Sequence, residues 1–340
     1  MKTAVFGAKT YDRQFFDQAN KDFKHELIFH SESLHQNTAL IAAGCPAVCA
    51  FVNDTLDAPT LSLLAQGGTR LIALRSAGYN NVDIPAAQKL KITVMRVPAY
   101  SPKAVAEHAV ALMLTLNRNI QHAYNRVREG NFELDGLVGF TMAGKTVGIV
   151  GTGKIGTALA GIMKGFNCQL LGYDTYHNPA CLALGMKYVE LPHLLAGSDI
   201  VSLHCPLTEE TKHLINDKTL GFMKKGSMLI NTARGALIDA CAVIEALKTR
   251  HLSYLGMDVY EEEGPLFFAD LSSTIIEDDV FERLTTFPNV VITGHQGFLT
   301  REALAEIAEV TLSNISDFQI GRPKAENLVA SQPSSQALKE

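Results

Sequence analysis

Two side chains in the last third of the chain could together reduce a 2-keto acid. Arg234 follows the apolar run 228–231, and His295 follows the apolar run 290–293. This reduction needs a cation for the carboxylate, polarisation of the carbonyl, and a proton for the oxygen that becomes a hydroxyl. The planar guanidinium of Arg234 can bind a carboxylate through two parallel hydrogen bonds and keeps its charge. Histidine is the usual proton donor near neutral pH.

An acidic run at 258–263 lies between these two residues, and its glutamates at 261–263 could hydrogen-bond the imidazole. Such a bond would fix the orientation of the ring and favour its charged, proton-donating form. Taken singly, these residues are more often structural, since an Arg-Gly pair is usually a surface turn and a lone histidine usually packs or caps. Their common position after predicted strands, beyond a nucleotide loop, favours the catalytic interpretation for Arg234 and His295.

The nucleotide loop has the pattern Gly151-x-Gly153-x-x-Gly156, between a predicted strand at 146–150 and a predicted helix at 157–165. Gly151 permits the tight turn, Gly153 lets the backbone approach a pyrophosphate, and Gly156 allows close packing of helix on strand. The helix N-terminus offers unpaired N–H groups to the phosphates. Asp174 ends the next strand, where a carboxylate accepts from ribose hydroxyls and would repel a 2′-phosphate. The pattern therefore predicts NAD rather than NADP.

A second phosphate-binding pattern, G-x-x-x-x-G-K-T, lies at 139–146. In a P-loop this pattern must lead into a helix whose N-terminus holds the phosphates. Here it leads into the predicted strand 146–150 instead. We therefore expect no binding of ATP or GTP.

Short runs rich in valine and isoleucine alternate with helical patterns along the chain, which is typical of an α/β fold with buried parallel strands. A long helix is predicted from 103 to 128, opened by Ser101-Pro102, and a domain boundary is placed near residue 100. Another helix is predicted from 301 to 318, and the tail 331–335 is predicted to be disordered. The predicted strands are 3–6, 47–52, 71–74, 93–96, 146–150, 169–173, 200–203, 228–231, 254–258 and 290–293.

Composition limits the possible classes of function. At 340 residues the chain is long enough for two domains of ordinary size. A net charge of −5 without a basic stripe argues against nucleic-acid binding. No stretch approaches the roughly 20 apolar residues of a membrane span. The six cysteines are scattered without a C-x-x-C pair, which suits reduced thiols in the cytoplasm, and no H-E-x-x-H pattern points to a metal.

With these motifs in place, the chain resembles the D-2-hydroxyacid dehydrogenase family, and is closest to its fermentative D-lactate dehydrogenase branch. The resemblance extends over about residues 1–328. It implies two doubly wound parallel-sheet (Rossmann-like) domains. An NAD-binding domain at 101–298 would be inserted into a discontinuous substrate domain at 1–100 and 299–340. The matching motifs lie at 75–83, 97–102, 148–156, 201–206, 231–235, 258–263 and 293–298.

The resemblance also assigns roles to individual residues. Arg234, Glu263 and His295 are the implied catalytic set, and the choice of Glu263 over its two neighbours comes from the resemblance. The implied substrate-binding residues are Ala77, Gly78, Tyr100, Phe298 and Phe51. Phenylalanine at 51 stands where related enzymes can carry a tyrosine. The implied cofactor-binding residues are Gly151, Thr152, Gly153, Lys154, Ile155, Gly156, Asp174, Cys205, Pro206, Thr211, Thr232, Ala233 and Asp258.

These assignments lead us to expect reversible, NADH-dependent reduction of pyruvate to D-lactate by a cytoplasmic homo-oligomer, a dimer or tetramer. The stereochemistry is implied by the resemblance alone. A sister enzyme acting on glyoxylate, hydroxypyruvate or a branched 2-keto acid would have the same catalytic residues. A more remote alternative is a non-catalytic NAD-sensing scaffold resembling a corepressor. The complete set of arginine, glutamate and histidine argues against that alternative.

Overall fold

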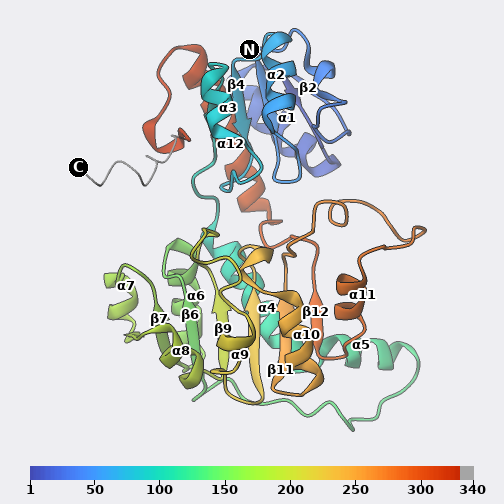
Figure 1. Ribbon diagram of the computed structural model, residues 1–340, viewed down its shortest axis with the longest axis vertical. Coiled ribbons are helices and arrows are strands. Elements are labelled where there is room, and N and C mark those ends of the chain that lie inside the picture. The colour runs from blue at the N-terminus through green and yellow to red at the C-terminus, as the bar shows by residue number, and fades with distance from the viewer. Residues whose placement is uncertain (330–340) are drawn as a thin grey trace. The chain divides into compact units, whose positions relative to one another are not determined.

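The computed structural model describes residues 1–329, which form two compact units. Unit 1 comprises Met1–Ser101 and the described residues from Leu299 onward, and unit 2 comprises Pro102–Phe298. Each unit has one sheet of parallel strands with helices on both faces (Figure 1). The predicted fold class, two doubly wound parallel-sheet domains, is therefore confirmed. The predicted disorder at 331–335 lies outside the described residues.

Unit 1 contains a five-stranded sheet in the order β2-β1-β3-β4-β5. Helices α1 and α12 cover one face, and α2 and α3 cover the other with the 3₁₀ helix η1. The strands are β1 (Lys2–Val5), β2 (Glu26–Phe29), β3 (Ala47–Ala50), β4 (Leu71–Leu74) and β5 (Thr93–Met95). The helices are α1 (Thr10–Phe23), η1 (Ala39–Ala42), α2 (Ala58–Gln66), α3 (Ile84–Lys89), α12 (Arg301–Gln319) and η3 (Ala325–Asn327).

Unit 2 contains a seven-stranded sheet in the order β12-β11-β10-β9-β6-β7-β8. Helices α4 and α6 pack on one face, and α8 and α10 pack on the other (Figure 1). The strands are β6 (Thr146–Val150), β7 (Gln169–Tyr173), β8 (Lys187–Tyr188), β9 (Ile200–Leu203), β10 (Ser227–Asn231), β11 (Leu252–Met257) and β12 (Val290–Ile292). The helices are α4 (Pro102–Asn117), α5 (Ile120–Arg128), α6 (Lys154–Gly165), α7 (Pro179–Ala183), α8 (Leu191–Gly197), α9 (Asp217–Leu220), η2 (Gly235–Leu237), α10 (Ala240–Lys248) and α11 (Asp279–Thr285).

The central strands read as unbroken apolar runs because they are buried on both faces. Successive side chains of a strand point to opposite faces. In β10, Met228 and Ile230 face the core under α4 and α6, whereas Leu229 faces the core under α10. Burial of both faces stabilises each sheet through the hydrophobic effect. The stabilising free energy is roughly 25 cal/mol for every Å² of apolar surface removed from water.

All ten predicted strands are present, with ends that shift by at most two residues. Two strands were not predicted, β2 and β8, and each is an edge strand of its sheet. Both are partly exposed, and β8 has only two residues. An edge strand that is half solvated lacks the continuous apolar run by which the central strands were found.

The single helix predicted from 103 to 128 is wrong, because the chain breaks between α4 and α5. Asn119 adopts the left-handed conformation, with φ of 51°. Just before it, the buried Asn117 side chain donates to the carbonyl of Phe140 (2.8 Å) and accepts from the N–H of Phe140 (2.7 Å). Gly139 packs so closely on the Asn117 carbonyl that a Cβ there would collide with it. These contacts of Asn117 with a distant segment end the helix.

The left-handed conformation of Asn119 predicts how substitutions at this position change the free energy of unfolding. The left-handed conformation costs a residue with a Cβ about 1–2 kcal/mol of conformational free energy. It has no such cost for glycine, and asparagine tolerates it better than most residues. Asn119→Ala should therefore lower the free energy of unfolding by about 1 kcal/mol, and Asn119→Gly should leave it within about 0.5 kcal/mol. Urea unfolding measures both changes. Asn125→Ala, inside α5, is the control and should not destabilise; equal effects of alanine at 119 and 125 would contradict this account.

Candidate active site

The order of strands in unit 2 brings the predicted catalytic and cofactor residues of this unit to one edge of the sheet. Parallel strands end at the same edge, where α/β proteins bind their ligands. From β12 inward, His295, Asp258 and Arg234 follow three adjacent strands. Cys205, Gly151 and Asp174 follow the next three, β9, β6 and β7. Residues that lie up to 144 positions apart in the sequence thus share one edge.

Arg234 lies in a turn that is held by Asn231, the last residue of β10. The buried Asn231 side chain accepts from the N–H of Ala233 (3.1 Å) and donates to the carbonyl of Arg234 (2.8 Å). Gly235 then packs on the backbone of Tyr260 so closely that a Cβ would collide with it. The turn bearing Arg234 is thereby fixed against the segment that follows β11. Within residues 1–329 the guanidinium makes one hydrogen bond, from Nη1 to the Ala233 carbonyl (2.6 Å), which leaves donors for an anion.

His295 is bonded to Glu263, one of the three consecutive glutamates. Its Nδ1 lies 2.7 Å from Oε1 of Glu263, and both side chains are largely buried. The other carboxylate oxygen of Glu263 accepts from the N–H of Tyr260 (3.0 Å). Glu261 instead lies 2.8 Å from His213 and is more exposed to solvent. Because Glu263 occupies Nδ1, the imidazole can offer its Nε2 to a ligand.

The turn that carries His295 is closed by the carboxylate of Asp258. This side chain is 2% exposed, and it accepts from the N–H groups of Gln296 (2.9 Å) and Gly297 (2.7 Å) and from the hydroxyl of Thr293 (2.5 Å). Burial alone would raise the pKa of Asp258, but hydrogen bonds from His108 and Thr293 outweigh burial, so its pKa is lowered. Asp258 is therefore an anion at neutral pH, and its oxygens hold the turn through these hydrogen bonds.

The glycine loop and Asp174 form the opposite half of this edge. Gly151 has φ of 91°, and a Cβ there would lie 2.5 Å from the backbone nitrogen of Cys205, so only glycine fits. Asp174 accepts from the N–H (2.6 Å) and the hydroxyl (3.1 Å) of Thr152. Burial would raise the pKa of Asp174, but the N–H of Thr152 and further hydrogen bonds lower it, so the carboxylate stays charged.

Two observations show that this edge fits a dinucleotide. A Cβ on Gly153 would meet no atom within 4 Å, and no side chain caps the N-terminus of α6, which Gly153 directly precedes. The unpaired N–H groups there can receive a pyrophosphate. Thr232 follows β10, which lies two strands from β6 in the sheet. Its buried hydroxyl has no hydrogen-bond partner among the described residues. Lys154, Ile155 and Gly156 form the first turn of α6.

The loop after β9 completes the predicted cofactor set. Burial raises the pKa of the Cys205 thiol to about 11, so it stays protonated at neutral pH and is no nucleophile. Thr211 donates to the carbonyl of Pro206 (2.7 Å) and accepts from the N–H of Thr208 (2.7 Å). The Thr211 hydroxyl therefore closes this loop.

The predicted substrate residues of unit 1 also follow neighbouring strands. Phe51 follows β3, Ala77 and Gly78 follow β4, and Tyr100 follows β5. Phe51 is buried, with the guanidinium of Arg75 4.8 Å from the centre of its ring. The loops after β3 and β4 are tied by Asn81, whose side chain donates to the Phe51 carbonyl (2.8 Å). Phe298, the last residue of unit 2, is buried.

No group of three or more histidine, cysteine, aspartate or glutamate side chains within residues 1–329 could hold a metal ion. Among the helices of the same residues, none combines the length and the apolar character that crossing a bilayer requires.

Comparisons with known proteins identify the family. The model of the D-isomer specific 2-hydroxyacid dehydrogenase family, NAD binding domain, matches residues 110–297. The chain is 53% identical to the D-lactate dehydrogenase of Escherichia coli strain K12 over 329 residues, which are 97% of this chain and 100% of that protein. The apo structure of the Escherichia coli D-lactate dehydrogenase superposes with a TM-score of 0.89 at 51% identity, covering 97% of this chain and 100% of the other.

Two further solved structures are similar over nearly the whole chain. The pyruvate reductase of Chlamydomonas reinhardtii gives a TM-score of 0.90 at 44% identity, over 96% of this chain and 98% of the other. The D-lactate dehydrogenase of Lactobacillus jensenii, solved with NAD⁺, gives 0.81 at 32% identity, over 97% and 100%. The chain therefore belongs to the D-isomer specific 2-hydroxyacid dehydrogenase family. It is an NAD-dependent oxidoreductase, and the residues that match the NAD-binding domain of the family lie within unit 2.

Three residues that shape the site were not recognised from the sequence in that role. Asn231 had a signal, because an asparagine directly after a strand often folds the next residues into a turn. Gly235 had none, since its need for glycine comes from the distant backbone of Tyr260. His108 had none either, because a single histidine in an alanine-rich helix is most often structural.

The loop geometry predicts that alanine affects stability at Gly151 but NADH binding at Gly153. Gly151→Ala should lower the free energy of unfolding by about 2–3 kcal/mol, because its Cβ collides with backbone. Gly153→Ala should stay within about 1 kcal/mol of the parent stability, yet bind NADH at least tenfold more weakly, since its methyl group occupies the space that a pyrophosphate needs. Urea unfolding and NADH fluorescence titration separate the two effects. Undiminished NADH affinity of Gly153→Ala would contradict this placement of the cofactor.

Proposed function

We propose that the protein catalyses the reversible reduction of pyruvate to D-lactate with NADH. The observation that carries this proposal is the bond between His295 and Glu263, two strands along the same edge from the turn of Arg234. An anion-binding guanidinium and an oriented imidazole are the two groups that a 2-keto acid requires. Relatives at 53% and 44% identity are a D-lactate dehydrogenase and a pyruvate reductase, which supports pyruvate as the substrate.

In this proposal Arg234 binds the substrate carboxylate and polarises the keto group. Bound NADH supplies the hydride that the keto carbon receives. His295 transfers the proton on its Nε2 to the substrate oxygen, so that the carbonyl becomes a hydroxyl and the imidazole becomes neutral. Glu263 keeps its hydrogen bond to Nδ1 throughout, and so holds the ring in one orientation. Lactate oxidation follows the same steps in reverse.

We further propose that unit 1 is the substrate domain. The N–H groups of Ala77 and Gly78 and the hydroxyl of Tyr100 would bind the carboxylate. Phe51 and Phe298 would enclose the methyl group of pyruvate. Phe51 is buried and packs against the guanidinium of Arg75, which restricts its movement and supports a preference for a small substrate side chain.

A panel of 2-keto acids tests the substrate. With NADH, kcat/KM should be highest for pyruvate, above glyoxylate, hydroxypyruvate and 2-ketoisocaproate, and chiral chromatography should show D-lactate as the product. A preference for one of the other acids would make the protein a sister enzyme of the family. Absence of NADH oxidation with every acid would favour the non-catalytic scaffold.

His295→Gln tests the proton donor. Glutamine can hydrogen-bond but cannot release a proton, so kcat for pyruvate should fall by roughly 10²- to 10⁴-fold. NADH affinity should stay within about threefold, because the change leaves the glycine loop intact. The matched control is His213→Gln, which alters a second histidine–glutamate pair of 2.8 Å at the surface and should retain kcat. Near-normal turnover of His295→Gln would remove His295 from the mechanism.

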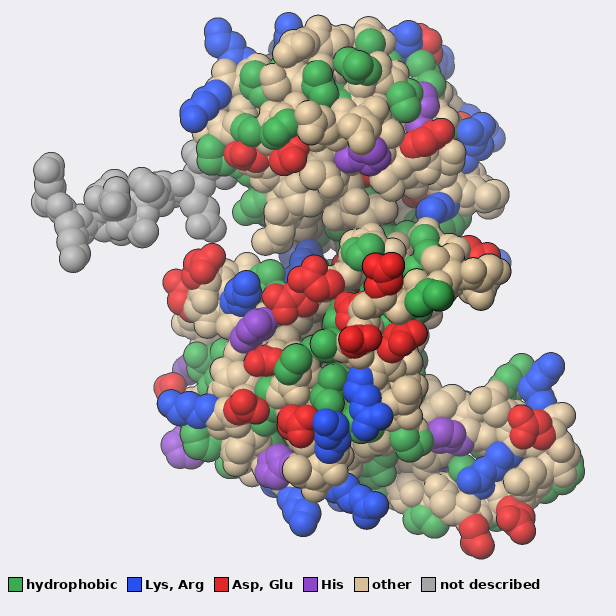
Figure 2. All heavy atoms as spheres, turned by 45° about the vertical axis from the view of Figure 1, so that its right-hand side comes forward, with side chains coloured by type: hydrophobic (Ala, Val, Ile, Leu, Met, Phe, Trp, Pro, Cys, Tyr) green, Lys and Arg blue, Asp and Glu red, His purple; other side chains and the backbone are tan. Residues whose placement is uncertain are grey.

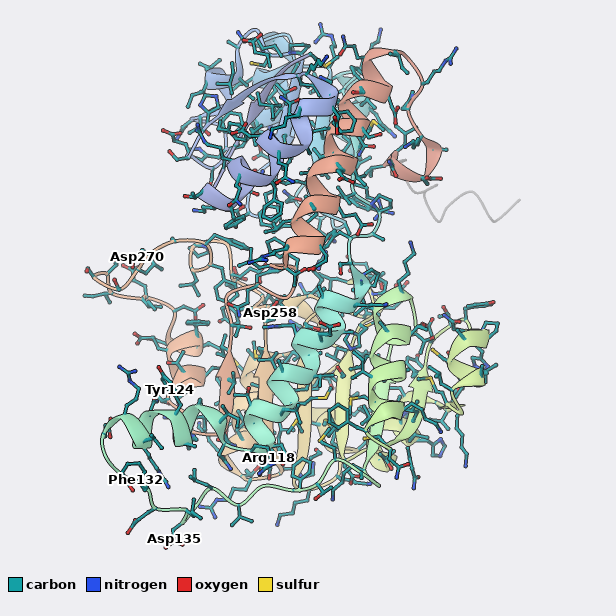
Figure 3. The ribbon with its side chains drawn as sticks, turned by 180° about the vertical axis from the view of Figure 1, so that it is seen from behind. Arg118, Tyr124, Phe132, Asp135, Asp258 and Asp270 are labelled. Atoms are coloured by element: carbon teal, nitrogen blue, oxygen red, sulfur yellow. The ribbon has the colours of Figure 1, made fainter. Side chains whose placement is uncertain are left out.

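We also propose that the protein is a homo-oligomer that pairs through an arm formed by residues 118–139. The arm comprises α5, which has no buried residue, and the extended segment after it (Figure 3). Within that segment Phe132, Leu134 and Val138 are 73%, 77% and 87% exposed, and Tyr124 is exposed on α5. In Figure 2, the visible surface of unit 2 carries hydrophobic side chains and charged side chains of both signs.

A second copy of the chain is the occupant that this arm fits. A monomer rarely exposes so many large apolar side chains in one segment. The last turn of α5 is basic, with Arg128, whereas the segment after it is acidic, with Glu133 and Asp135. A two-fold axis would pair each basic turn with the acidic segment of the other copy. The homo-oligomer, dimer or tetramer, would bury both kinds of contact.

The double variant Phe132→Ser/Leu134→Ser should convert the oligomer to a monomer, because it removes the apolar surface that pairing would bury. Sedimentation equilibrium measures the mass. Phe166→Ser, at an exposed phenylalanine outside the arm, should leave the mass unchanged. A monomeric parent protein, or a double variant with the parent mass, would contradict the proposal.

The cytoplasm is the proposed compartment. All six cysteines are free thiols, including the exposed Cys241. An oxidising compartment favours disulfides in its proteins, so free thiols support a reducing one.

A further inference from the structure

His108 of α4 contacts two residues that hold the turn of His295. Its Nε2 lies 3.0 Å from the hydroxyl oxygen of Thr293 and 3.2 Å from Oδ1 of Asp258. The side chain of His108 is 16% exposed and that of Asp258 only 2%. Figure 3 shows Asp258 at the end of the sheet beside α4. Thus a histidine on a helix that begins unit 2 meets the ends of β11 and β12.

The direction of these hydrogen bonds follows from their donors. Thr293 has one hydroxyl proton, which it donates to Asp258 (2.5 Å), and the carboxylate of Asp258 can only accept. Nε2 of His108 must therefore carry a proton and donate it toward both oxygens. With Gln296 and Gly297, His108 and Thr293 bring four donors to one buried carboxylate, about as many as it can accept.

The turn between Thr293 and Gly297 needs this support. His295 has φ of 53°, a left-handed conformation that a residue with a Cβ adopts only when its surroundings impose it. Its own N–H donates to the Asp258 carbonyl (2.8 Å). A Cβ on Gly297 would lie 3.0 Å from Oδ2 of Asp258 and 3.5 Å from Cδ2 of His108, so the three residues are in close contact. A shift of His108 or Asp258 would move the turn.

We propose that His108 is a positioning residue that acts through Asp258 and Thr293 to hold the turn from which His295 reaches its substrate. The proposal rests on the proposed function, because that function makes His295 the proton donor. His108 itself need not contact substrate or cofactor. It supplies the donor that keeps the buried Asp258 carboxylate, and with it the turn, in one arrangement.

Two substitutions at His108 separate positioning from bulk. His108→Leu keeps a similar volume but removes the donor, whereas glutamine can place an amide nitrogen near the position of Nε2. We expect His108→Leu to lower kcat for pyruvate by about 10- to 100-fold, the loss typical of a misplaced catalytic group. His108→Gln should recover kcat to within about threefold, and both should keep NADH affinity within about threefold. Unchanged kcat in His108→Leu, or an equal loss of NADH affinity, would overturn the proposal.

His251→Leu is the matched control. His251 is also a half-buried histidine of unit 2, and its Nε2 bonds the carbonyl of Leu220 (2.9 Å). It precedes β11, whereas Asp258 follows that strand, so it lies at the opposite edge of the sheet. We expect this variant to keep the parent kcat. A loss as large as that of His108→Leu would show a general effect of removing a bonded histidine, and would overturn the proposal.

Thr293→Val tests the same turn without altering α4, and remains usable if His108→Leu does not fold. It should lower kcat, Thr293→Ser should restore it, and NADH affinity should change little in both. Because both residues act through one turn, their effects on kcat should not multiply. The double variant His108→Leu/Thr293→Val should have a kcat within about threefold of that of the single variant with the lower kcat. Losses that multiply would show independent action and contradict the proposal.

The outcome at His295 keeps this test separate from that of the proposed function. If His295→Gln retains turnover, the proposed proton donor is wrong, whatever His108 does. If His295→Gln loses turnover while His108→Leu and Thr293→Val retain it, the positioning proposal alone fails.

Discussion

The parallel pairing of the strands is the constraint on which the rest of unit 2 depends. Because every strand of the sheet runs in the same direction, the loops that follow the strands emerge at one edge. Asp174, Gly151, Cys205, Arg234 and His295 then lie along that edge in the order of the strands, not in the order of the chain. The apolar side chains that bury both faces of the sheet therefore also decide which polar residues become neighbours.

At this edge, short polar side chains next to the strands fix the loops. Asn231 at the end of β10 binds the turn of Arg234, Asp258 after β11 binds the turn of His295, and Asp174 after β7 binds the start of the glycine loop. A buried amide or carboxylate is costly unless its hydrogen bonds are satisfied. Asn231 and Asp258 are buried and Asp174 is half-buried, and each of the three bonds N–H or carbonyl groups of the loop that it orders. The hydrogen bonds that satisfy the side chain therefore also fix the loop.

The sequence predicted most of this fold because apolar periodicity is a local signal. It failed where a distant contact decides the outcome, as at Asn117, whose bonds to Phe140 end a helix that the local pattern would continue. The same limit applies to the site. Spacing could place Arg234 and His295 after strands, but three consecutive glutamates look alike until the turn at Tyr260 directs Glu263 to the imidazole. His108 lies 185 residues before Thr293, and no local pattern joins them.

The residues of this edge differ in how much of the fold depends on them. A Cβ on Gly153 would meet no atom within 4 Å, and Nε2 of His295 makes no hydrogen bond to a described residue, so these groups can serve a ligand at little structural cost. Gly151, Asn231 and Asp258, in contrast, are packed or bonded on several sides. Substitution of the first kind should change binding or turnover in a protein that still folds, whereas substitution of the second kind alters loop geometry and stability together. The groups proposed to contact ligands thus contribute little to the stability of the loops that carry them. Their positions are fixed by other residues, which need not contact the substrate.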